Sequence, residues 1–421
     1  MRKKIAILLT AVLVLVALAG CNAKAPASVA TPEGEQQVVN FTTWRSEDAP
    51  VFNDMVKMFE EKTGIKVNLE ITSSDMTEYL TILKTRVTTG EGADVYNIWP
   101  GAYINEYIDA GYCLDLGPTG IPGMYQDGFN VFGEKNGKQY GVCSSFNTIA
   151  IYYNKTIFDE LGISKPVTYA DWKAACDKVS AAGYLTVAAG FAEAWTTSMA
   201  YETLLGIYAP DNPLTMTQPE TGDSKITDDL YVTVYKDFEQ MYKDGIWQKD
   251  AVGTGYDASI SLFATGEAAM LISGTWSIGG IKELDPNLDF GVFALPGVNK
   301  EAIVPIMPAQ LLAINPNAKN LDAAIKWVEF LSSPEGGGYY CENTVQSVTI
   351  KNFESSAPEL SLVQELMSGK TCEWPDTYMK DTRTQDVFDS ISVKILNGTP
   401  VMQALEEGQA TFEADIIPNN K

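Results

Sequence analysis

Four tryptophans at the ends of predicted strands are the side chains best suited to hold a small molecule. Trp44, Trp99, Trp195 and Trp276 each fall at a junction between elements, and none belongs to an apolar helix stripe. In open α/β sheets, ligands bind at the carboxyl ends of the strands. A large flat ring there suits a ligand with flat apolar faces and polar edges, such as a pyranose. Trp276 could also simply pack between helices, because tryptophan is highly buried on average.

The segment 262–276 predicts how Trp276 is positioned. Gly266 falls where a left-handed residue would stop the preceding helix. The run 268–272 is short, apolar and uncharged, which is typical of a strand covered on both faces. Gly274 then turns the chain, and Thr275 is placed to cap the next helix. The segment therefore delivers Trp276 just beyond the carboxyl end of a central strand.

Strand and helix patterns alternate along the rest of the chain, which predicts an α/β fold with a parallel sheet. The strands are expected at 38–44, 65–71, 93–99, 148–155, 288–295 and 303–314. A helix starting near Pro50 should stop at Gly64, and another should start at the cap Thr168. Residues 73–75 should cap a further helix, and 210–223 reads as a polar loop. Trp374 is expected to open a long helix near the carboxyl terminus.

The first 37 residues indicate export and anchoring. Three basic residues precede the apolar run 5–19, which is too short for an ordinary membrane span. We therefore predict a signal peptide at 1–20. Cys21 follows Leu-Ala-Gly directly, as in a bacterial lipobox, so Cys21 is expected to be lipidated, and 21–37 to form a flexible tether. The alternative is an ordinary signal peptide with an incidental cysteine.

Composition excludes several classes of function. The chain of 421 residues carries a net charge of −24, which disfavours binding to phosphate backbones, so no nucleic-acid partner is expected. It contains no histidine, which excludes Ser-His-Asp catalysis and makes a zinc site improbable. No cofactor or metal is predicted. The cysteines after Cys21 show no metal or redox spacing and are expected to be small buried side chains, although one disulfide is conceivable: Cys113, Cys143, Cys176, Cys341 and Cys372.

The order of several short motifs resembles the bacterial extracellular solute-binding proteins of carbohydrate ABC transporters, the group typified by maltose-binding protein. The matching pieces are spread over most of the chain: 63–67, 92–95, 110–116, 137–142, 152–155 and 263–276. Cys143 departs from the pattern, because the family often has proline there. The resemblance implies a two-lobed periplasmic-binding-protein-like fold, with two doubly wound α/β lobes joined by a three-segment hinge.

The resemblance also implies where the lobes divide. The first lobe would hold 38–143 and 302–347, and the second 144–301 and 348–421. The chain would cross between them near 143–147, 296–302 and 345–350. The ligand would lie between the lobes, which close over it by hinge bending.

Aligned roughly with the family, several residues match or neighbour ligand-contacting positions: Trp44, Asp48, Asn97, Glu193 and Trp195. Trp276 matches the stacking aromatic best. Trp374 is a weaker candidate, because the late aromatic of the family would fall nearer Gln385. Asp48 and Asn97 could instead be helix caps or loop residues, since both residue types favour such places for local reasons.

The function implied is that of a lipid-anchored monomeric receptor, not an enzyme. It would bind a mono- or oligosaccharide and deliver it to ABC transporter permease subunits, and its membrane contact would be the N-terminal lipid. One alternative is a secreted glycoside hydrolase with paired carboxylates, although no acid lies in a catalytic signature. Another is a solute-binding protein for ferric ion or an anion, for which Tyr339 and Tyr340 could be considered. Adjacent helical residues do not face the same way, however.

Overall fold

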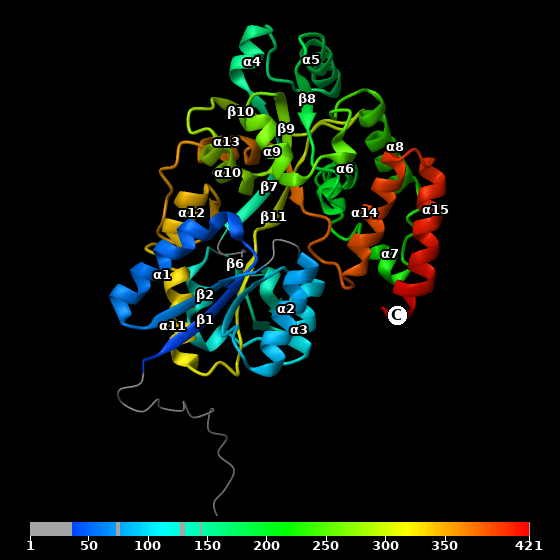
Figure 1. Ribbon diagram of the computed structural model, residues 1–421. Coiled ribbons are helices and arrows are strands. Elements are labelled where there is room, and N and C mark those ends of the chain that lie inside the picture. Colours follow the sequence, from blue (N-terminus) through cyan, green and yellow to red (C-terminus); the bar gives the residue numbers. More distant parts are fainter. Residues whose placement is uncertain (1–35, 73–75, 127–130, 144, 421) are drawn as a thin grey trace, which may run out of the picture. The chain divides into compact units, whose positions relative to one another are not determined.

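The computed structural model describes residues 36–72, 76–126, 131–143 and 145–420. From Gln36 onward the chain forms one compact unit, in which helices flank two large sheets (Figure 1). A third, two-stranded sheet pairs β4 (Glu134–Lys135) with β5 (Lys138–Gln139). The predicted signal peptide at 1–20, Cys21, most of the tether and the predicted helix cap at 73–75 lie outside the described residues. Because helices cover both faces of each sheet, the α/β expectation is confirmed.

The first sheet has the order β2-β1-β3-β12-β6 within the described residues. The pairs β1–β2 and β1–β3 are parallel, whereas β12 runs antiparallel to both β3 and β6. The sheet is therefore mixed: the predicted parallel pairing is found between β1 and its two neighbours, whereas β12 adds antiparallel pairs. Its strands are β1 (Val38–Thr43), β2 (Lys66–Ile71), β3 (Val95–Ile98), β12 (Leu311–Ile314) and β6 (Val142–Cys143).

Helices lie on both faces of the first sheet (Figure 1). One face packs against α1 (Ala49–Thr63), α11 (Leu321–Leu331) and α12 (Gly337–Thr344), and the other against α2 (Met76–Thr89) and α3 (Ala102–Asp109). In α1, Phe52, Met55 and Phe59 are spaced by three and four residues, so they share one buried face. The helix ends as predicted, at Gly64 with a left-handed φ of 71°.

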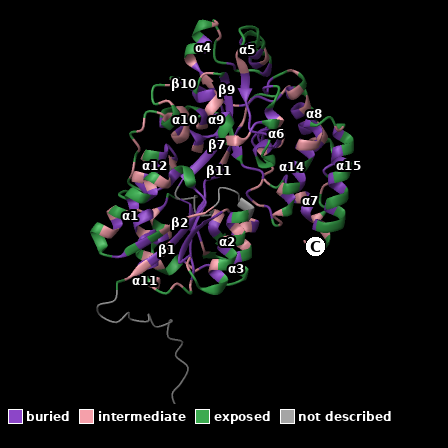
Figure 2. Ribbon diagram, viewed as in Figure 1, coloured by how far each residue is buried: buried purple, intermediate pink, exposed green. Residues whose placement is uncertain are grey.

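The second sheet is built around the long strand β7 (Ser145–Asn154). Strand β7 pairs antiparallel with β9, β10, β11 and β13, whereas β8 and β14 add parallel pairs at the edges. Figure 2 shows that the strands of both sheets are buried beneath more exposed helices. The remaining strands of this sheet are β8 (Leu185–Ala188), β9 (Ala268–Gly274), β10 (Phe290–Phe293), β11 (Val304–Pro308), β13 (Ser347–Val348) and β14 (Thr371–Glu373).

Two groups of helices sandwich the second sheet (Figure 1). The larger group comprises α4 (Lys155–Glu160), α5 (Tyr169–Ala181), α6 (Ser198–Tyr208), α8 (Asp229–Lys243), α14 (Arg383–Leu396) and α15 (Val401–Thr411). The smaller comprises α9 (Tyr256–Ala264), α10 (Ile278–Leu284) and α13 (Leu360–Met367). Helix α5 starts as predicted, because the Thr168 side chain accepts a hydrogen bond from the Asp171 N–H in a capping box.

The chain passes between the sheets at three places: between β6 and β7, between β11 and β12, and between α12 and β13. The first lies between Cys143 and Ser145, and the third between Thr344 and Ser347. The second lies at Ala309 and Gln310, not at 296–302, because β11 pairs with β7 and β14 in the second sheet. Residues 302–308 therefore belong with the second lobe, and the first lobe resumes only after them.

Three local expectations were wrong. Helix α14 begins at Arg383 rather than at Trp374, because 374–379 forms a turn whose backbone bonds run from Thr377 to Trp374 and from Met379 to Asp376. The expected loop 210–223 contains the short helix α7 (Gln218–Thr221). Thr275 caps no helix, since its hydroxyl donates to Asn147 Oδ1 at 3.1 Å instead.

Candidate functional site

Strand β9 brings Trp276 to the edge of the second sheet, as the sequence predicts. All residues of β9 are buried; Ile272 faces one core of the lobe and Leu271 the other. Beyond the strand, the indole of Trp276 folds back over Gly274, where an added Cβ would lie 2.0 Å from a ring carbon. Glycine is therefore required at 274 for this ring position. The indole remains partly exposed at the end of the strand.

Tyr256 connects Trp276 to Trp195. The Trp276 Nε1 donates to the Tyr256 hydroxyl at 2.6 Å, and the Trp195 and Tyr256 ring centres lie 5.0 Å apart. We call Trp195, Tyr256 and Trp276 the aromatic cluster. Trp195 is 42 % exposed, although large apolar side chains are usually covered. The cluster therefore presents an accessible aromatic surface built from three segments far apart in sequence.

Glu193 holds two members of the aromatic cluster in place. One carboxylate oxygen accepts from the Tyr256 backbone N–H at 2.9 Å, and the other accepts from Trp195 Nε1 at 3.2 Å. The residue itself is exposed. Tyr256 was missed by sequence reasoning; its only signal is an aromatic residue that follows Gly255 at the start of α9.

The first lobe contributes a stacked pair of tryptophans. The rings of Trp44 and Trp99 lie 5.6 Å apart with an interplanar angle of 29°, and Tyr79 meets Trp44 edge-on at 5.1 Å. Trp44 follows β1 and is buried, whereas Trp99 follows β3 and is partly exposed. Since Trp44 supports Trp99 from behind, Trp99 is the member of the pair that a ligand could reach.

Glu47 shows that the two lobes face each other at this place. Loss of solvent raises the pKa of the Glu47 carboxyl, Arg45 lowers this pKa, and the carboxylate of Asp257 in the second lobe raises it further. Glu47 in turn contributes to the raised pKa of Tyr256, which is caused mainly by burial. Glu47 of the first lobe therefore lies near Asp257 and Tyr256 of the second lobe.

Asp48, a predicted ligand residue, is occupied by partners inside the first lobe. It is 4 % exposed, and its Oδ2 lies 2.5 Å from Arg45 Nε and accepts from the Tyr340 hydroxyl at 2.6 Å. A buried carboxylate with a cation and a hydroxyl donor is already satisfied. The geometry gives Asp48 a structural role.

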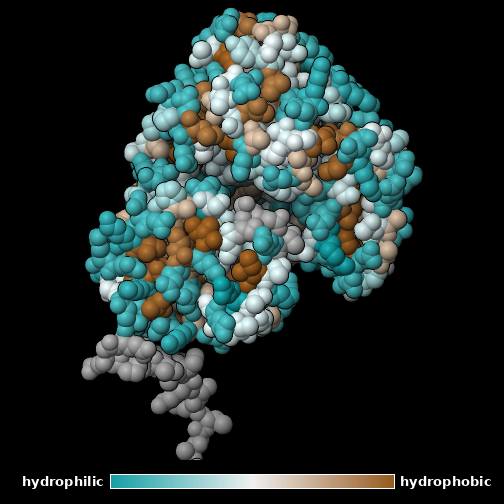
Figure 3. All heavy atoms as spheres, viewed as in Figure 1, coloured by the Kyte–Doolittle hydropathy of each residue, from teal (hydrophilic) through white to brown (hydrophobic). Residues whose placement is uncertain are grey.

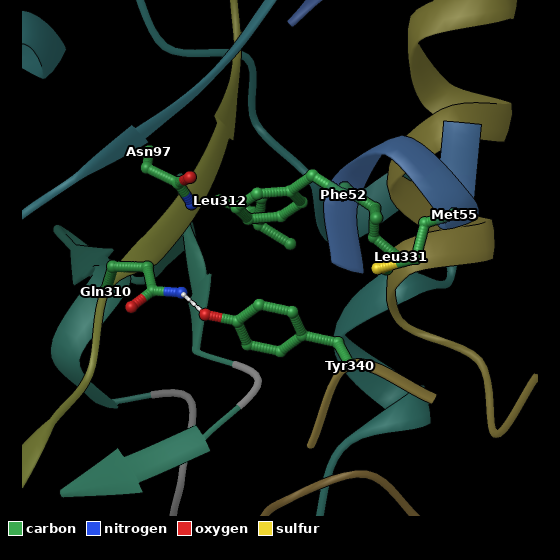
Figure 4. A pocket seen from close by; sticks show the side chains of 7 residues that line it. All are labelled: Phe52, Met55, Asn97, Gln310, Leu312, Leu331 and Tyr340. Carbon is green, nitrogen blue, oxygen red and sulfur yellow. Dashed lines mark hydrogen bonds between the residues drawn. The ribbon is translucent and has the colours of Figure 1, made fainter. Parts of the chain in front are cut away.

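Asn97 lines a small internal pocket rather than the surface between the lobes (Figure 4). Successive residues of a strand point to opposite faces. Tyr96 and Ile98 pack toward α2 and α3, so Asn97 points toward α1. The pocket measures about 10 Å³, which is about the size of one water molecule. It is too small for a sugar.

Trp374 is also buried, with 4 % of its surface exposed. It packs in the main core of the second lobe, and its backbone N–H donates to the Ile306 carbonyl oxygen at 3.1 Å. The structure therefore separates the eight predicted ligand residues into two groups. Trp99, Glu193, Trp195 and Trp276 are accessible, whereas Trp44, Asp48, Asn97 and Trp374 are buried.

The tyrosine pair considered for an anion or ferric ion does not converge. Tyr340 points into the first lobe toward Asp48, whereas Tyr339 donates to Asp54 at 3.0 Å on the surface. Within the described residues, no group of three or more His, Cys, Asp or Glu side chains is arranged to hold a metal ion. The cysteines 113, 143, 176, 341 and 372 are buried, as expected for small core side chains.

Comparison with known proteins agrees with this architecture. The family model described as bacterial extracellular solute-binding protein matches residues 44–338. The multiple sugar-binding protein of Streptococcus mutans is 27 % identical over 391 residues, which cover 88 % of this chain and 89 % of that protein. The family and this relative are both named for binding, and neither is named for a reaction.

Two solved structures share the fold. A chitin oligosaccharide binding protein superimposes with a TM-score of 0.78 at 20 % identity, over 91 % of this chain and 100 % of its own. The solute-binding protein RafE in complex with raffinose gives a TM-score of 0.77 at 24 % identity, with the same coverage. At this level of identity the two structures support the two-lobed fold alone.

Proposed function

Since the chain belongs to the bacterial extracellular solute-binding protein family, we propose that it captures a mono- or oligosaccharide between its two lobes. It delivers the sugar to the permease subunits of an ABC transporter. The family consists of binding proteins, so the hydrolase alternative is not favoured. The relative named as a multiple sugar-binding protein supports a carbohydrate ligand.

The observation that carries this proposal is the aromatic cluster, which lies near Glu47 of the first lobe. A pyranose has apolar C–H faces that stack on indole or phenol rings. Stacking on Trp276 would bury roughly 50–100 Å², worth about 1–3 kcal/mol at about 25 cal/mol per Å². The carboxylates of Glu193 and Glu47 lie beside the rings and can accept hydrogen bonds from sugar hydroxyls.

We assign ligand contact to the accessible residues Trp99, Glu193, Trp195 and Trp276 and add Tyr256 and Glu47 to them. Trp44 supports Trp99 from within the first lobe, whereas Asp48, Asn97 and Trp374 are buried and are assigned no ligand contact. The receptor acts as a monomer anchored outside the cell membrane through a lipid on Cys21. Within the described part of the chain, every helix is too short or too polar to span a lipid bilayer. On the face drawn in Figure 3, hydrophilic residues surround several separate hydrophobic patches.

A calorimetric screen of the purified full chain against neutral oligosaccharides tests this proposal. Raffinose, maltotriose and chitin trisaccharide are suitable probes, and at least one should bind reversibly without cleavage. Trp195→Ala should weaken that binding about tenfold with little loss of stability, because the side chain is half-exposed. Met402→Ala is the matched control, since Met402 is 41 % exposed on α15.

Two outcomes would contradict the proposal. One is the release of shortened sugars during incubation, which would indicate a hydrolase. The other is a screen in which no saccharide raises the melting temperature, since a ligand at about 100 times its Kd stabilises by about 2.7 kcal/mol.

A further inference from the structure

We propose that the second lobe contains an acidic subsite, formed by Glu202, Asp376 and Asp389, that binds a protonated amine on the ligand. The ligand would then be an amino sugar, or a saccharide that carries one. This inference deepens the proposed function and rests on it, because the subsite adjoins the aromatic cluster.

The acidic subsite is built by three segments beside the aromatic cluster. Glu202 lies in α6, directly after the short helix η5 (Ala194–Thr197) that carries Trp195. Helix η5 packs against α14, which carries Asp389. Asp376 lies in the turn between β14 and α14, close enough to Glu202 for its charge to raise the Glu202 pKa. A ligand on Trp195 could therefore extend toward these carboxyl groups.

The first lobe closes over the same place. Gly101 at the start of α3 lies so near the turn after β14 that an added Cβ would be 2.8 Å from the Thr377 carbonyl oxygen. The next aromatic, Tyr103, has a pKa raised by burial and further by Asp376, Asp386, Asp389 and Glu202. Because Tyr103 belongs to the first lobe, separation of the lobes would uncover the acidic subsite.

Among the described residues, no cationic side chain is paired with these carboxyl groups. In the described parts of the chain, neither Lys nor Arg forms an ion pair with Glu202, Asp376 or Asp389, whereas the buried Asp48 is paired with Arg45. Glu202 is fully buried and Asp389 is 5 % exposed. Burial raises the pKa of Asp376 to about 7 and of Asp389 to about 8. Burying several ionised carboxyl groups without a counter-charge costs free energy. A cationic group on the ligand would supply that counter-charge, so its binding here would be strongly favoured.

Gln385 shows which hydrogen-bonding groups remain open. Its Nε2 donates to the Tyr201 hydroxyl at 2.7 Å, to Glu202 Oε1 at 3.1 Å and to Asp389 Oδ1 at 3.2 Å. The donors of its amide are thus used, and its Oε1 has no partner among the described residues. The same holds for the buried Glu202 Oε2 and for Thr377 Oγ1.

The three oxygens without a partner in the described parts of the chain can each accept a hydrogen bond, and an ammonium group can donate these bonds. An ammonium has three N–H donors and no acceptor, whereas a sugar hydroxyl brings a single donor. A metal ion fits less well, because within the described residues the carboxylates are not arranged as a group of three metal ligands. The exposed Asp386 lies on the same helix and adds negative charge at the rim.

The test compares glucosamine and galactosamine with glucose and galactose by calorimetric titration of the full chain at about pH 7. At least one amino sugar should bind tenfold or more tightly than its neutral parent. The bound cation should also ionise the carboxyl groups, so titrations in buffers of different ionisation enthalpy should reveal proton release. Amino sugars that bind no more tightly than their parents would overturn the proposal.

Variants of the carboxyl groups test whether these residues cause the preference for amino sugars. Glu202→Gln should reduce the preference for an amino sugar over its neutral parent to less than threefold. If Glu202→Gln does not fold, Asp376→Asn tests the same preference, because Asp376 is partly exposed. Asp237→Asn is the matched control, because Asp237 is a buried acid elsewhere in the second lobe that accepts from Tyr208 and the Val298 N–H. A preference that survives Glu202→Gln would overturn the subsite. Binding of neutral oligosaccharides without any amine preference would overturn the subsite alone and leave the proposed function intact.

Discussion

The Tyr340 hydroxyl donates to Asp48 Oδ2 at 2.6 Å, although the two residues are 292 positions apart. The same hydroxyl accepts from Gln310 Nε2 at 3.1 Å, drawn in Figure 4, and from Gln346 Nε2 at 3.0 Å. Gln310 and Gln346 lie in the second and third crossings, and Gln346 Oε1 accepts from Ser145 at the first. One buried phenol thus links the loop that carries Glu47 to all three crossings between the lobes.

Tyr340→Phe should therefore destabilise the first lobe and the hinge. The change removes the hydroxyl donor to Asp48, which keeps Arg45, and takes away the oxygen that accepts from Gln310 Nε2 and Gln346 Nε2. This loss should cost about 1–3 kcal/mol in the free energy of unfolding. Urea unfolding measures this loss. Tyr339→Phe is the neighbouring control, because Tyr339 bonds Asp54 at the surface, and it should change stability by less than about 0.5 kcal/mol. If both variants lost the same stability, the hydrogen bonds of the Tyr340 hydroxyl would not be the cause.

Gly274→Ala should displace the Trp276 ring while leaving the backbone unstrained. The φ angle at Gly274 is −76°, which alanine adopts freely, but its Cβ would collide with the indole at 2.0 Å. We expect sugar binding to weaken about ten- to a hundredfold, as measured by calorimetry. Gly279→Ala in α10 has open space around its Cβ and should bind normally. Wild-type affinity in Gly274→Ala would show that the ring position is irrelevant to binding.

Trp276→Ala should weaken sugar binding about ten- to a hundredfold, because the stacking surface is lost and each 1.4 kcal/mol is about tenfold. The Tyr256 hydroxyl also loses the donor at 2.6 Å. Calorimetric titration measures the role of Trp276 in sugar binding, and melting of the ligand-free protein measures its role in stability. An unchanged affinity with a large loss of stability would assign Trp276 to the core alone.

Asp389→Asn should change how stability depends on pH. Burial raises the pKa of Asp389 to about 8 and of Asp376 to about 7, against about 3.9 in an unfolded chain. Between about pH 4 and 8 the folded state therefore binds more protons, so these groups lower stability as the pH rises. The variant should gain stability relative to the wild type from pH 5 to pH 8 in urea unfolding. If the stability of the variant and of the wild type depended on pH in the same way, the raised pKa of Asp389 would be contradicted.

Cys21→Ser should release the protein from the membrane, because the lipid would no longer be attached. Detergent-phase partitioning of the full chain checks this: the wild type should enter the detergent phase and the variant the aqueous phase. Cys372→Ser is the control, since it removes a cysteine from the folded part of the chain. Retention of Cys21→Ser in the detergent phase would count against a lipoprotein.

The sequence by itself determined those features whose causes are local. Gly64 stops α1 because glycine adopts the left-handed conformation, Thr168 caps α5 through its own hydroxyl, and the run 268–272 forms a buried strand. Each signal acts within a few residues. Trp276 at the end of β9 could be predicted for the same reason.

Only the tertiary structure decided which polar and aromatic side chains are free to bind. Asp48 follows β1 in a short 3-10 helix and Asn97 lies near the end of β3, where a ligand residue could stand. However, Asp48 is bonded by Tyr340, and Asn97 faces a pocket under α1. Tyr256 joins Trp195 to Trp276 although 61 and 20 residues separate it from them. Strand β11 belongs to the second sheet because β7 and β14 pair with it. Such outcomes depend on contacts between distant segments, and no local pattern encodes the partner.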